Sequence, residues 1–178
     1  DLPFRSPKEG KNIVYTSLWD NYPDSISIML KGKASHAYLL MAGSTNPMQY
    51  AIENAVVRVE YADGTSDELM LTPPVNWCPI EQEFLENATA FPQPELRPYR
   101  LGLASGKVSR HLFRDLHLEV TRNMADVPRF KKAVAEVDGG AAILLDMPLD
   151  GKKKLKRLIL RALSNEVVIG LMGITLQK

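Results

Sequence analysis

The sequence has very little cysteine, almost no excess of charge and no long apolar run. Its single cysteine, Cys78, has no intramolecular partner, which excludes a disulfide-stapled fold and a CxxC zinc site. The 22 Lys and Arg residues are balanced by 21 Asp and Glu residues, so the net charge of +1 provides no general attraction for nucleic acid. No run reaches the roughly 18 apolar residues that span a bilayer. We therefore expect no nucleic-acid partner and no membrane insertion.

The remaining composition is that of an ordinary globular protein. The 178 residues are 45% hydrophobic and 24% charged, and no internal repeat or polar linker divides the chain. These proportions predict one domain covering residues 1–178. Because the chain begins with Asp1 rather than Met, we expect it to be a fragment or module of a larger protein.

Alternation of apolar and polar residues, which is typical of half-buried strands, recurs along the chain. The clearest case is residues 57–61, followed by Asp63-Gly64, a dipeptide that favours a tight hairpin, and by a second alternating stretch. Residues 26–30 and 116–120 alternate in the same way. Two continuous apolar runs, residues 38–42 and 167–172, indicate strands that lie inside a sheet. Together these patterns predict an all-β fold.

Three other stretches have less regular patterns. Six prolines between residues 72 and 99 predict a long connection, because proline lacks the N–H that a central strand donates. The apolar spacing in residues 124–140 predicts a short helix or an extended excursion. Residues 152–163 fit an amphipathic helical stripe, but Asp150-Gly151 before them is typical of a hairpin turn, and we predict a strand there.

Loops rich in aromatic and amide side chains are the candidate ligand site. Residues 17–23 place two aromatic rings beside an Asp and an Asn, and such groups stack on a pyranose ring and bond its hydroxyls. In the alternative interpretation, the same rings plug the end of the fold and the polar groups make turn hydrogen bonds. If residues 43–50 and 76–80 meet this loop, the three loops form a rim for a polar, uncharged ligand. The residues predicted to line this rim are Trp19, Asp20, Asn21, Tyr22, Asn46, Gln49 and Trp77.

Catalytic interpretations have little support in the sequence. Cys78 has no accompanying nucleophile signature, and the three histidines lack the spacing of a metal-binding helix. No pair of carboxylates stands out as the acid and base of a glycosidase. We therefore assign no catalytic residue. The histidines are His36, His111 and His117.

Two charged clusters also have simple interpretations. The lysine-rich residues 152–157 could neutralise phosphates, but we interpret them as a solvated strand edge. Asp63, Asp67 and Glu68 could supply oxygen ligands to a structural Ca²⁺, although an exposed acidic turn is the simpler interpretation. We therefore predict no metal site and no cofactor.

Three segments resemble a known family: residues 38–49, the hairpin at 57–65 and the ending at 167–176. They are similar to galactose-binding-like β-sandwiches, and more narrowly to the carbohydrate-binding-module type of accessory domain in large secreted bacterial glycoside hydrolases. Residues 81–140 look like an irregular or partly helical insertion. The resemblance implies a jelly-roll fold and an extracytoplasmic location: periplasmic, cell-surface or secreted.

The resemblance also implies a role. We predict a non-catalytic carbohydrate-binding or accessory module of a polysaccharide-degrading system, with a glycan or polysaccharide as its partner. Two alternatives stay open. The domain could brace an adjacent catalytic domain and bury its aromatic residues there, or it could be a glycoside hydrolase that uses paired carboxylates.

Overall fold

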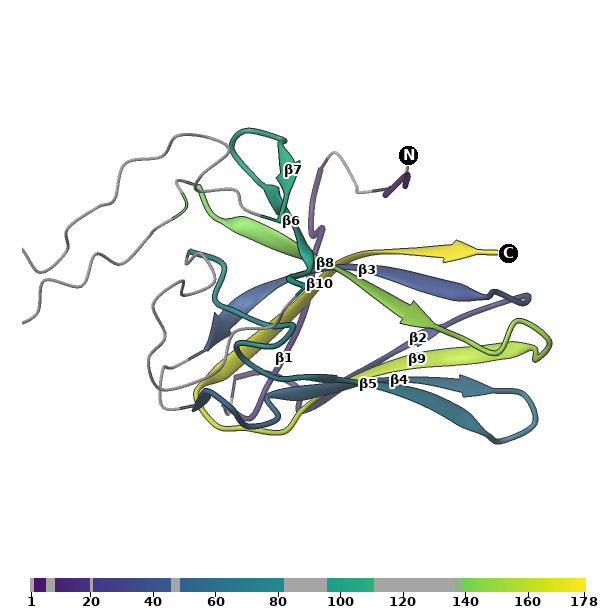
Figure 1. Cartoon of the computed structure of the whole chain (residues 1–178). Helices are drawn as coiled ribbons and strands as arrows, with labels where there is room; N and C mark the ends of the chain where they lie inside the picture. Colours follow the sequence, from purple (N-terminus) through teal and green to yellow (C-terminus); the bar gives the residue numbers. More distant parts are fainter. Residues whose placement is uncertain are drawn as a thin grey trace, which may run out of the picture.

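The computed structural model describes residues 2–5, 9–19, 21–45, 49–81, 96–110, 137 and 139–178. These residues form ten strands in two antiparallel sheets (Figure 1). Within them, no helix has the length and apolar character needed to cross a membrane. The strands are β1 (Val14–Ser17), β2 (Ser25–Met29), β3 (His36–Thr45), β4 (Ala55–Tyr61), β5 (Ser66–Leu71), β6 (Tyr99–Gly102), β7 (Val108–Ser109), β8 (Ala141–Pro148), β9 (Leu155–Ala162) and β10 (Val167–Gln177).

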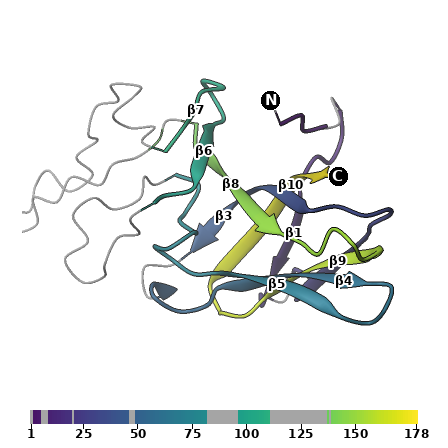
Figure 2. The ribbon, with the colours of Figure 1, turned by 45° about the vertical axis from the view of Figure 1, so that its right-hand side comes forward.

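The two sheets lie face to face as the layers of a sandwich (Figures 1 and 2). One has six strands in the order β1-β10-β3-β8-β6-β7, and the other has four in the order β2-β9-β4-β5. Consecutive strands alternate between the sheets from β1 to β4 and again from β8 to β10, so these connections cross from layer to layer. The prediction of an all-β sandwich is confirmed.

The core lies between the sheets because each strand sends alternate side chains inward. On β4, Val57, Val59 and Tyr61 are buried, whereas Arg58 between them is exposed. The facing strands contribute similar inward rows. The largest fully buried side chains of this layer include Trp77, Tyr61, Leu39, Met41, Leu71, Ile143, Met147, Leu158 and Leu160.

The hairpin and the central strands predicted from the sequence are confirmed. β4 pairs with β5 along its length, and Gly64 in the turn between them has a φ of +88°, which glycine adopts without steric cost. β3 lies between β10 and β8, and β10 lies between β1 and β3. Both continuous apolar runs, residues 38–42 and 167–172, are therefore inside a sheet.

The segment with the helical stripe is strand β9, as predicted, but its neighbours differ from the prediction. β8 belongs to the six-stranded sheet and β9 to the four-stranded sheet, so Asp150-Gly151 connects two layers and does not close a hairpin. β9 also lies between β2 and β4, so the lysine-rich segment is not a strand edge. One positive charge of this segment is paired within the four-stranded sheet: Arg157 donates two hydrogen bonds to Glu60, at 2.7 and 3.1 Å.

Part of the predicted insertion belongs to the six-stranded sheet. β6 and β7 pair with each other, and β6 also pairs with β8. The prediction of an irregular or partly helical insertion is wrong for residues 96–110, because Gly106, with a φ of +69°, turns the chain back into a hairpin. The strand predicted at 116–120, and all of the helix predicted at 124–140 except residues 137, 139 and 140, lie outside the described residues.

The outer face of the six-stranded sheet carries its own apolar layer. Residues 2–5 cross it, with Phe4 close against Gly173, and the Thr175 hydroxyl donates a hydrogen bond of 2.5 Å to the Pro3 carbonyl. Beneath this segment lies a second, smaller apolar cluster. Its members are Leu40, Ala42 and Ala142, with Phe4, Ile80, Leu101 and Met172 packed against them.

Candidate functional site

The loops predicted to form a rim leave the sheets at one end of the sandwich. In the six-stranded sheet, Ser17 at the end of β1 pairs with Val168, and Thr45 at the end of β3 pairs with the adjacent Val167. In the four-stranded sheet, the ends of β5 and β9 both meet the start of β4. The topology therefore brings the loops after β1, β3 and β5 to a common end.

Asn54 forms hydrogen bonds to several segments at this loop end. Its buried side chain accepts a 2.7 Å hydrogen bond from the Thr45 hydroxyl and donates one of 2.9 Å to the Gln49 carbonyl. Its main chain donates to the Leu71 carbonyl and accepts from the Leu163 N–H. One residue thus connects the ends of strands from both sheets. The sequence analysis missed it, because an Asn before a strand has the ordinary appearance of a turn residue.

Trp77, which the sequence analysis placed on the ligand rim, is fully buried in the core. Gly43 makes room for the ring, since a Cβ at position 43 would lie 2.9 Å from the indole Cζ2. The neighbouring Asn76 closes its own turn by accepting from the Thr72 N–H at 2.9 Å and donating to the Met70 carbonyl at 2.7 Å. The prediction that Trp77 contacts ligand is therefore wrong, and its indole acts as a core side chain.

Most other predicted rim residues are not brought together. Trp19 is 49% exposed in the turn after β1, and Asn21 is exposed in the same turn. Gln49 is half-buried and uses its carbonyl within its own loop. The two others, Asp20 and Asn46, lie outside the described residues.

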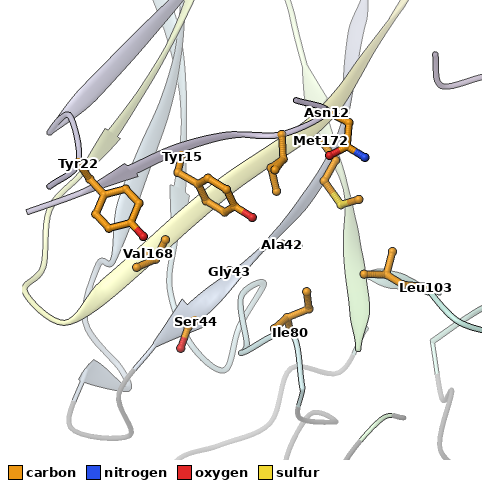
Figure 3. A pocket seen from close by; sticks show the side chains of 11 residues that line it. Asn12, Tyr15, Tyr22, Ala42, Gly43, Ser44, Ile80, Leu103, Val168 and Met172 are labelled. Carbon is orange, nitrogen blue, oxygen red and sulfur yellow. The ribbon is translucent and has the colours of Figure 1, made fainter. Parts of the chain in front are cut away.

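A groove of about 510 Å³ lies on the outer face of the six-stranded sheet, next to the loop end (Figure 3). This volume falls in the range of small-molecule sites, roughly 300–1,000 Å³. Of the predicted rim residues that the structure describes, Tyr22 alone lines it. The other lining residues are Asn12, Ile13, Tyr15, Ala42, Gly43, Ser44, Ile80, Leu103, Val168 and Met172.

One wall of the groove forms where a large, an absent and a small side chain follow one another across three paired strands. Tyr15 on β1 pairs with Gly170 on β10, and Gly170 pairs with Ala42 on β3. A Cβ at Gly170 would lie 2.6 Å from Ile13 Cδ1, 2.7 Å from the Ala42 carbonyl oxygen and 2.8 Å from Tyr15 Cε1. Glycine at position 170 therefore lets Ile13 and Tyr15 lie over the sheet as one wall of the groove.

The opposite side of the groove is held by main-chain hydrogen bonds. The Ile80 N–H donates to the Gly43 carbonyl at 2.8 Å, and the Ile80 carbonyl accepts from the Ala141 N–H at 2.8 Å. The Leu103 N–H donates to the Gly140 carbonyl at 2.9 Å. These bonds attach both side-wall residues directly to the sheet.

Two tyrosines dominate the first wall. The rings of Tyr15 and Tyr22 have centroids 6.4 Å apart and planes at 73°, and the two residues are 39% and 37% exposed. Figure 3 shows both rings on one side of the groove, with Asn12 toward one end and Ser44 on the β3 side. Within the part of the chain that the structure describes, the hydroxyls of the two tyrosines and of Ser44 make no hydrogen bond.

The described lining of the groove is uncharged. None of these eleven residues carries an ionisable carboxylate, imidazole, ammonium or guanidinium group. At the nearby loop end, the pKa of the Tyr50 phenol is raised to about 12, mainly by burial and then by Cys78 and Glu81, with Arg100 opposing. Tyr50 is therefore a neutral phenol at physiological pH and is not poised to act as a base.

The histidines form no metal centre in the described part of the chain. His36 Nδ1 lies 2.7 Å from Asp146 Oδ1, and its ring stacks on Tyr38 on the outer face of the six-stranded sheet, far from the groove. His111 and His117 lie outside the described residues. Among the residues described, no three His, Cys, Asp or Glu side chains are grouped to hold a metal.

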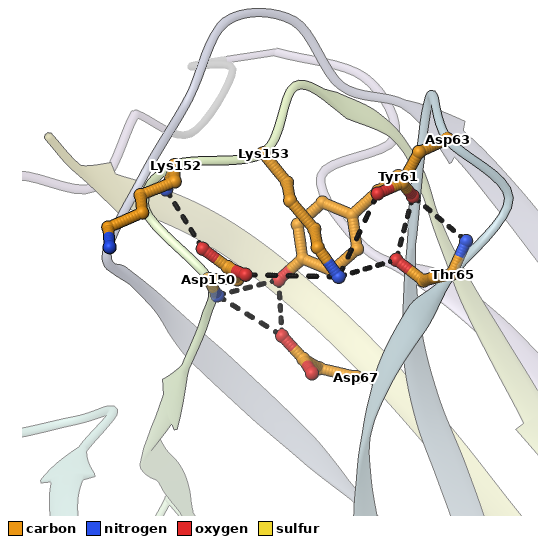
Figure 4. Close-up of polar contacts among 7 residues, drawn as sticks. All are labelled: Tyr61, Asp63, Thr65, Asp67, Asp150, Lys152 and Lys153. Carbon is orange, nitrogen blue, oxygen red and sulfur yellow. Dashed lines mark hydrogen bonds and ion pairs between the residues drawn. The ribbon is translucent and has the colours of Figure 1, made fainter.

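Of the acidic residues considered as calcium ligands, only Asp63 pairs with a lysine among the described residues (Figure 4). Lys153 Nζ donates to the Thr65 hydroxyl at 2.8 Å and lies 3.8 Å from one carboxylate oxygen each of Asp63 and Asp150. The Asp67 carboxylate accepts the Tyr61 hydroxyl. Glu68 points away, to Arg58. The ammonium group of Lys153 thus supplies the positive charge at this end of the sandwich.

Comparisons with known proteins give no relative from which a function could be inferred. No family model matches the chain, and no curated protein or solved structure matches it either.

Sequence reasoning missed most of the groove. Tyr15 lies in a four-residue strand too short for a clear alternation, and the part played by Gly170 depends on Tyr15, which is distant in the sequence. The one available signal was the density of aromatic residues around the first strand. That signal found Tyr22 but assigned it to a rim with Trp19 instead of a groove with Tyr15.

Proposed function

We propose that this domain is a non-catalytic module that binds a neutral carbohydrate in the groove on the six-stranded sheet. The observation that carries the proposal is the exposed Tyr15–Tyr22 pair in a groove whose described lining is uncharged. The C–H face of a sugar ring packs on aromatic rings, and its hydroxyls need both donors and acceptors. The phenols, Ser44 and the Asn12 amide offer both kinds of group without any charge.

The strand order supports a jelly-roll assignment for the fold. When the β6–β7 hairpin is set aside, eight strands remain in two sheets of four, with β1 beside β10 and β2 beside β9. Jelly rolls are eight-stranded double sheets of this kind. The order is consistent with the resemblance to galactose-binding-like accessory domains, and we extend the proposal to their extracytoplasmic location. Because a fold does not determine a function, the groove carries more weight than the strand order.

The composition of the groove favours binding over hydrolysis at this site. A glycosidase places two carboxyl groups on opposite sides of the scissile bond. Among the described residues that line the groove there is no Asp or Glu. We therefore propose that any polysaccharide cleavage belongs to an adjacent catalytic domain.

Binding of the purified domain to a glycan array, followed by isothermal titration, tests the proposal. Replacing Tyr15 or Tyr22 by Ala removes a stacking ring worth ~1–1.5 kcal/mol, so each variant should bind about tenfold more weakly. Tyr38→Ala is the matched control, because Tyr38 lies on the same sheet face but stacks on His36 outside the groove. All variants should keep cooperative melting, and salt should change the affinity little.

Three results would overturn this assignment. Unchanged affinity in both groove variants together with loss in Trp19→Ala would move the site to the loop end. A steep salt dependence would replace the neutral ligand by a polyanion. If the domain binds no glycan on the array, the alternative role is favoured: a module that braces a neighbouring hydrolase domain.

A further inference from the structure

We infer that the groove seats a single sugar ring of a soluble glycan, and does not hold the flat surface of an ordered polysaccharide. This inference rests on the proposed function and specifies its ligand. It follows from the angle between the two tyrosines, the two walls of the groove and the position of the polar groups.

The angle between the rings excludes a platform. A flat polysaccharide surface presents sugar rings in one plane, so stacking on it requires aromatic rings that are close to coplanar. The planes of Tyr15 and Tyr22 cross at 73°. When one ring lies flat against a sugar, the other can offer only its edge to the same plane. The pair therefore forms a corner that contacts one ring from two directions.

The groove lies between two walls. Ile13 and Tyr15 lie over Gly170 and form one wall, and between the walls Ala42 contributes only a methyl group. Ile80 and Leu103 line the other side and are attached to the sheet. A flat polymer face would rest on these walls and leave the space between them empty, while a single ring can enter there.

The polar groups lie along the same groove. Figure 3 shows the Tyr15 and Tyr22 hydroxyls, the Asn12 amide and the Ser44 hydroxyl distributed around the groove. Within the described residues none of these hydroxyls bonds to another protein group. Such an arrangement fits the ring of hydroxyls at the edge of one pyranose, and all of these donors and acceptors are uncharged.

Affinity as a function of chain length provides the test. We would titrate the domain with cello-, xylo-, manno- and galacto-oligosaccharides from monosaccharide to hexasaccharide, and mix it with microcrystalline cellulose and chitin. In the series that binds, the dissociation constant should change by less than about threefold from disaccharide to hexasaccharide, or ~0.65 kcal/mol. The protein should stay in the supernatant of both insoluble polysaccharides.

Conservative variants test the corner itself. Tyr22→Phe keeps the ring and removes the hydroxyl, so it should weaken binding by only a few fold, whereas Tyr22→Ala should weaken it by about tenfold. Tyr38→Phe is the matched control and should leave affinity unchanged.

Two outcomes would overturn the inference and leave the proposed function intact. One is affinity that keeps rising with chain length up to the hexasaccharide. The other is retention on microcrystalline cellulose or chitin that Tyr15→Ala abolishes. Failure to bind any soluble or insoluble carbohydrate defeats the proposed function as well, so the two failures are distinguishable.

Discussion

The outer faces of the two sheets are built by the same alternation of side chains, yet they differ in what their polar groups do. On the four-stranded sheet, Arg58 Nε lies 2.5 Å from a Glu68 oxygen, and Arg157 bonds Glu60. On the six-stranded sheet, the described lining of the groove is uncharged, and its tyrosine hydroxyls make no hydrogen bond within the described residues. The arginines and glutamates named on the first face pair with each other, whereas the groove leaves polar groups for a ligand.

This contrast shows why exposure alone does not identify a binding surface. Met29 on the outer face of the four-stranded sheet is 70% exposed, more than either tyrosine of the groove. It lies at the end of β2 and is not among the residues that line the groove. Scattered exposed apolar side chains are ordinary on protein surfaces. The groove differs because two walls, two rings and unpaired hydroxyls coincide.

The largest expected effect comes from removing β10, which supplies part of the lining of the groove and part of the core. Deleting residues 167–178 removes Val167, Ile169 and Leu171, all buried, and takes away the strand that pairs with both β1 and β3. Each buried side chain contributes ~1.5–3 kcal/mol, and the hydrogen bonds to β1 and β3 are lost as well. The total is comparable with the whole free energy of unfolding of a typical domain, ~5–15 kcal/mol. Fragment 1–166 should therefore fail to fold, as judged by circular dichroism and thermal melting. A soluble fragment that melts cooperatively would contradict this.

A smaller effect is expected when the space beneath the Ile13–Tyr15 wall is filled. In Gly170→Ala, the new methyl group must displace Ile13, Tyr15 or the Ala42 carbonyl, and such overpacking costs ~1–3 kcal/mol. Chemical denaturation should show this loss, and titration should show weaker carbohydrate binding. Gly151→Ala is the matched control: its nearest atoms lie at 3.5 Å, so its stability should change by less than about 0.5 kcal/mol. Equal stabilities for the two variants would show that the wall is not tightly packed on Gly170.

The polar end of the four-stranded sheet should respond to alkaline pH. The pKa of the Tyr61 phenol is raised to about 12, chiefly by burial and then by its hydrogen bond to Asp67. Because this value lies above the unfolded value near 10, the stabilisation is complete below pH ~10 and is lost as pH rises toward ~12. Tyr61→Phe should cost ~1–2 kcal/mol at neutral pH and flatten the alkaline decline.

Tyr50 offers the control for that measurement. Its pKa is also raised to about 12, but it lies at the opposite, loop end of the sandwich. Tyr50→Phe should reduce the decline over the same pH range, and the double variant should reduce it by the sum of the two effects. An alkaline melting profile that neither substitution changes would refute the assignment of this decline to the two phenols.

The smallest effect is expected on the charged face itself. A hydrogen bond from Arg157 is the main cause that holds the pKa of Glu60 below its ordinary value, but both groups are open to solvent. Arg157→Ala should therefore change the melting temperature only slightly, and added salt should reduce the change. The contribution is present above the unfolded pKa of Glu60 and is lost as pH falls through its folded pKa. A large, salt-independent loss would mean that this face is structural in its own right.

Local sequence signals predicted much of the fold. Asp63-Gly64 located the hairpin, and two continuous apolar runs located central strands, because both signals depend on neighbouring residues. The strand at 155–162 was predicted correctly, but its partners were not. Asp150-Gly151 has the composition of a hairpin turn. The chain crosses between the sheets at this point because β9 pairs with β2 and β4 instead of β8.

The candidate site was less predictable, because it depends on pairings between distant residues. The burial of Trp77 depends on Gly43, because a side chain at position 43 would occupy the space of the indole. The groove depends on the alignment of Tyr15 with Gly170 and Ala42. The composition correctly predicted aromatic residues near the loop end of the molecule. Which of them face solvent together depends on the register between the strands.

The two main-chain bonds of Ile80 have a consequence for the thermodynamics of recognition. A loop wall that must be ordered by its ligand reduces affinity, because the lost conformational freedom opposes the favourable free energy of binding. Ile80 is already bonded to Gly43 and to Ala141, so this wall is preorganised before any ligand arrives. The binding entropy of the groove should therefore be set by the sugar and its displaced water, with little contribution from the protein backbone.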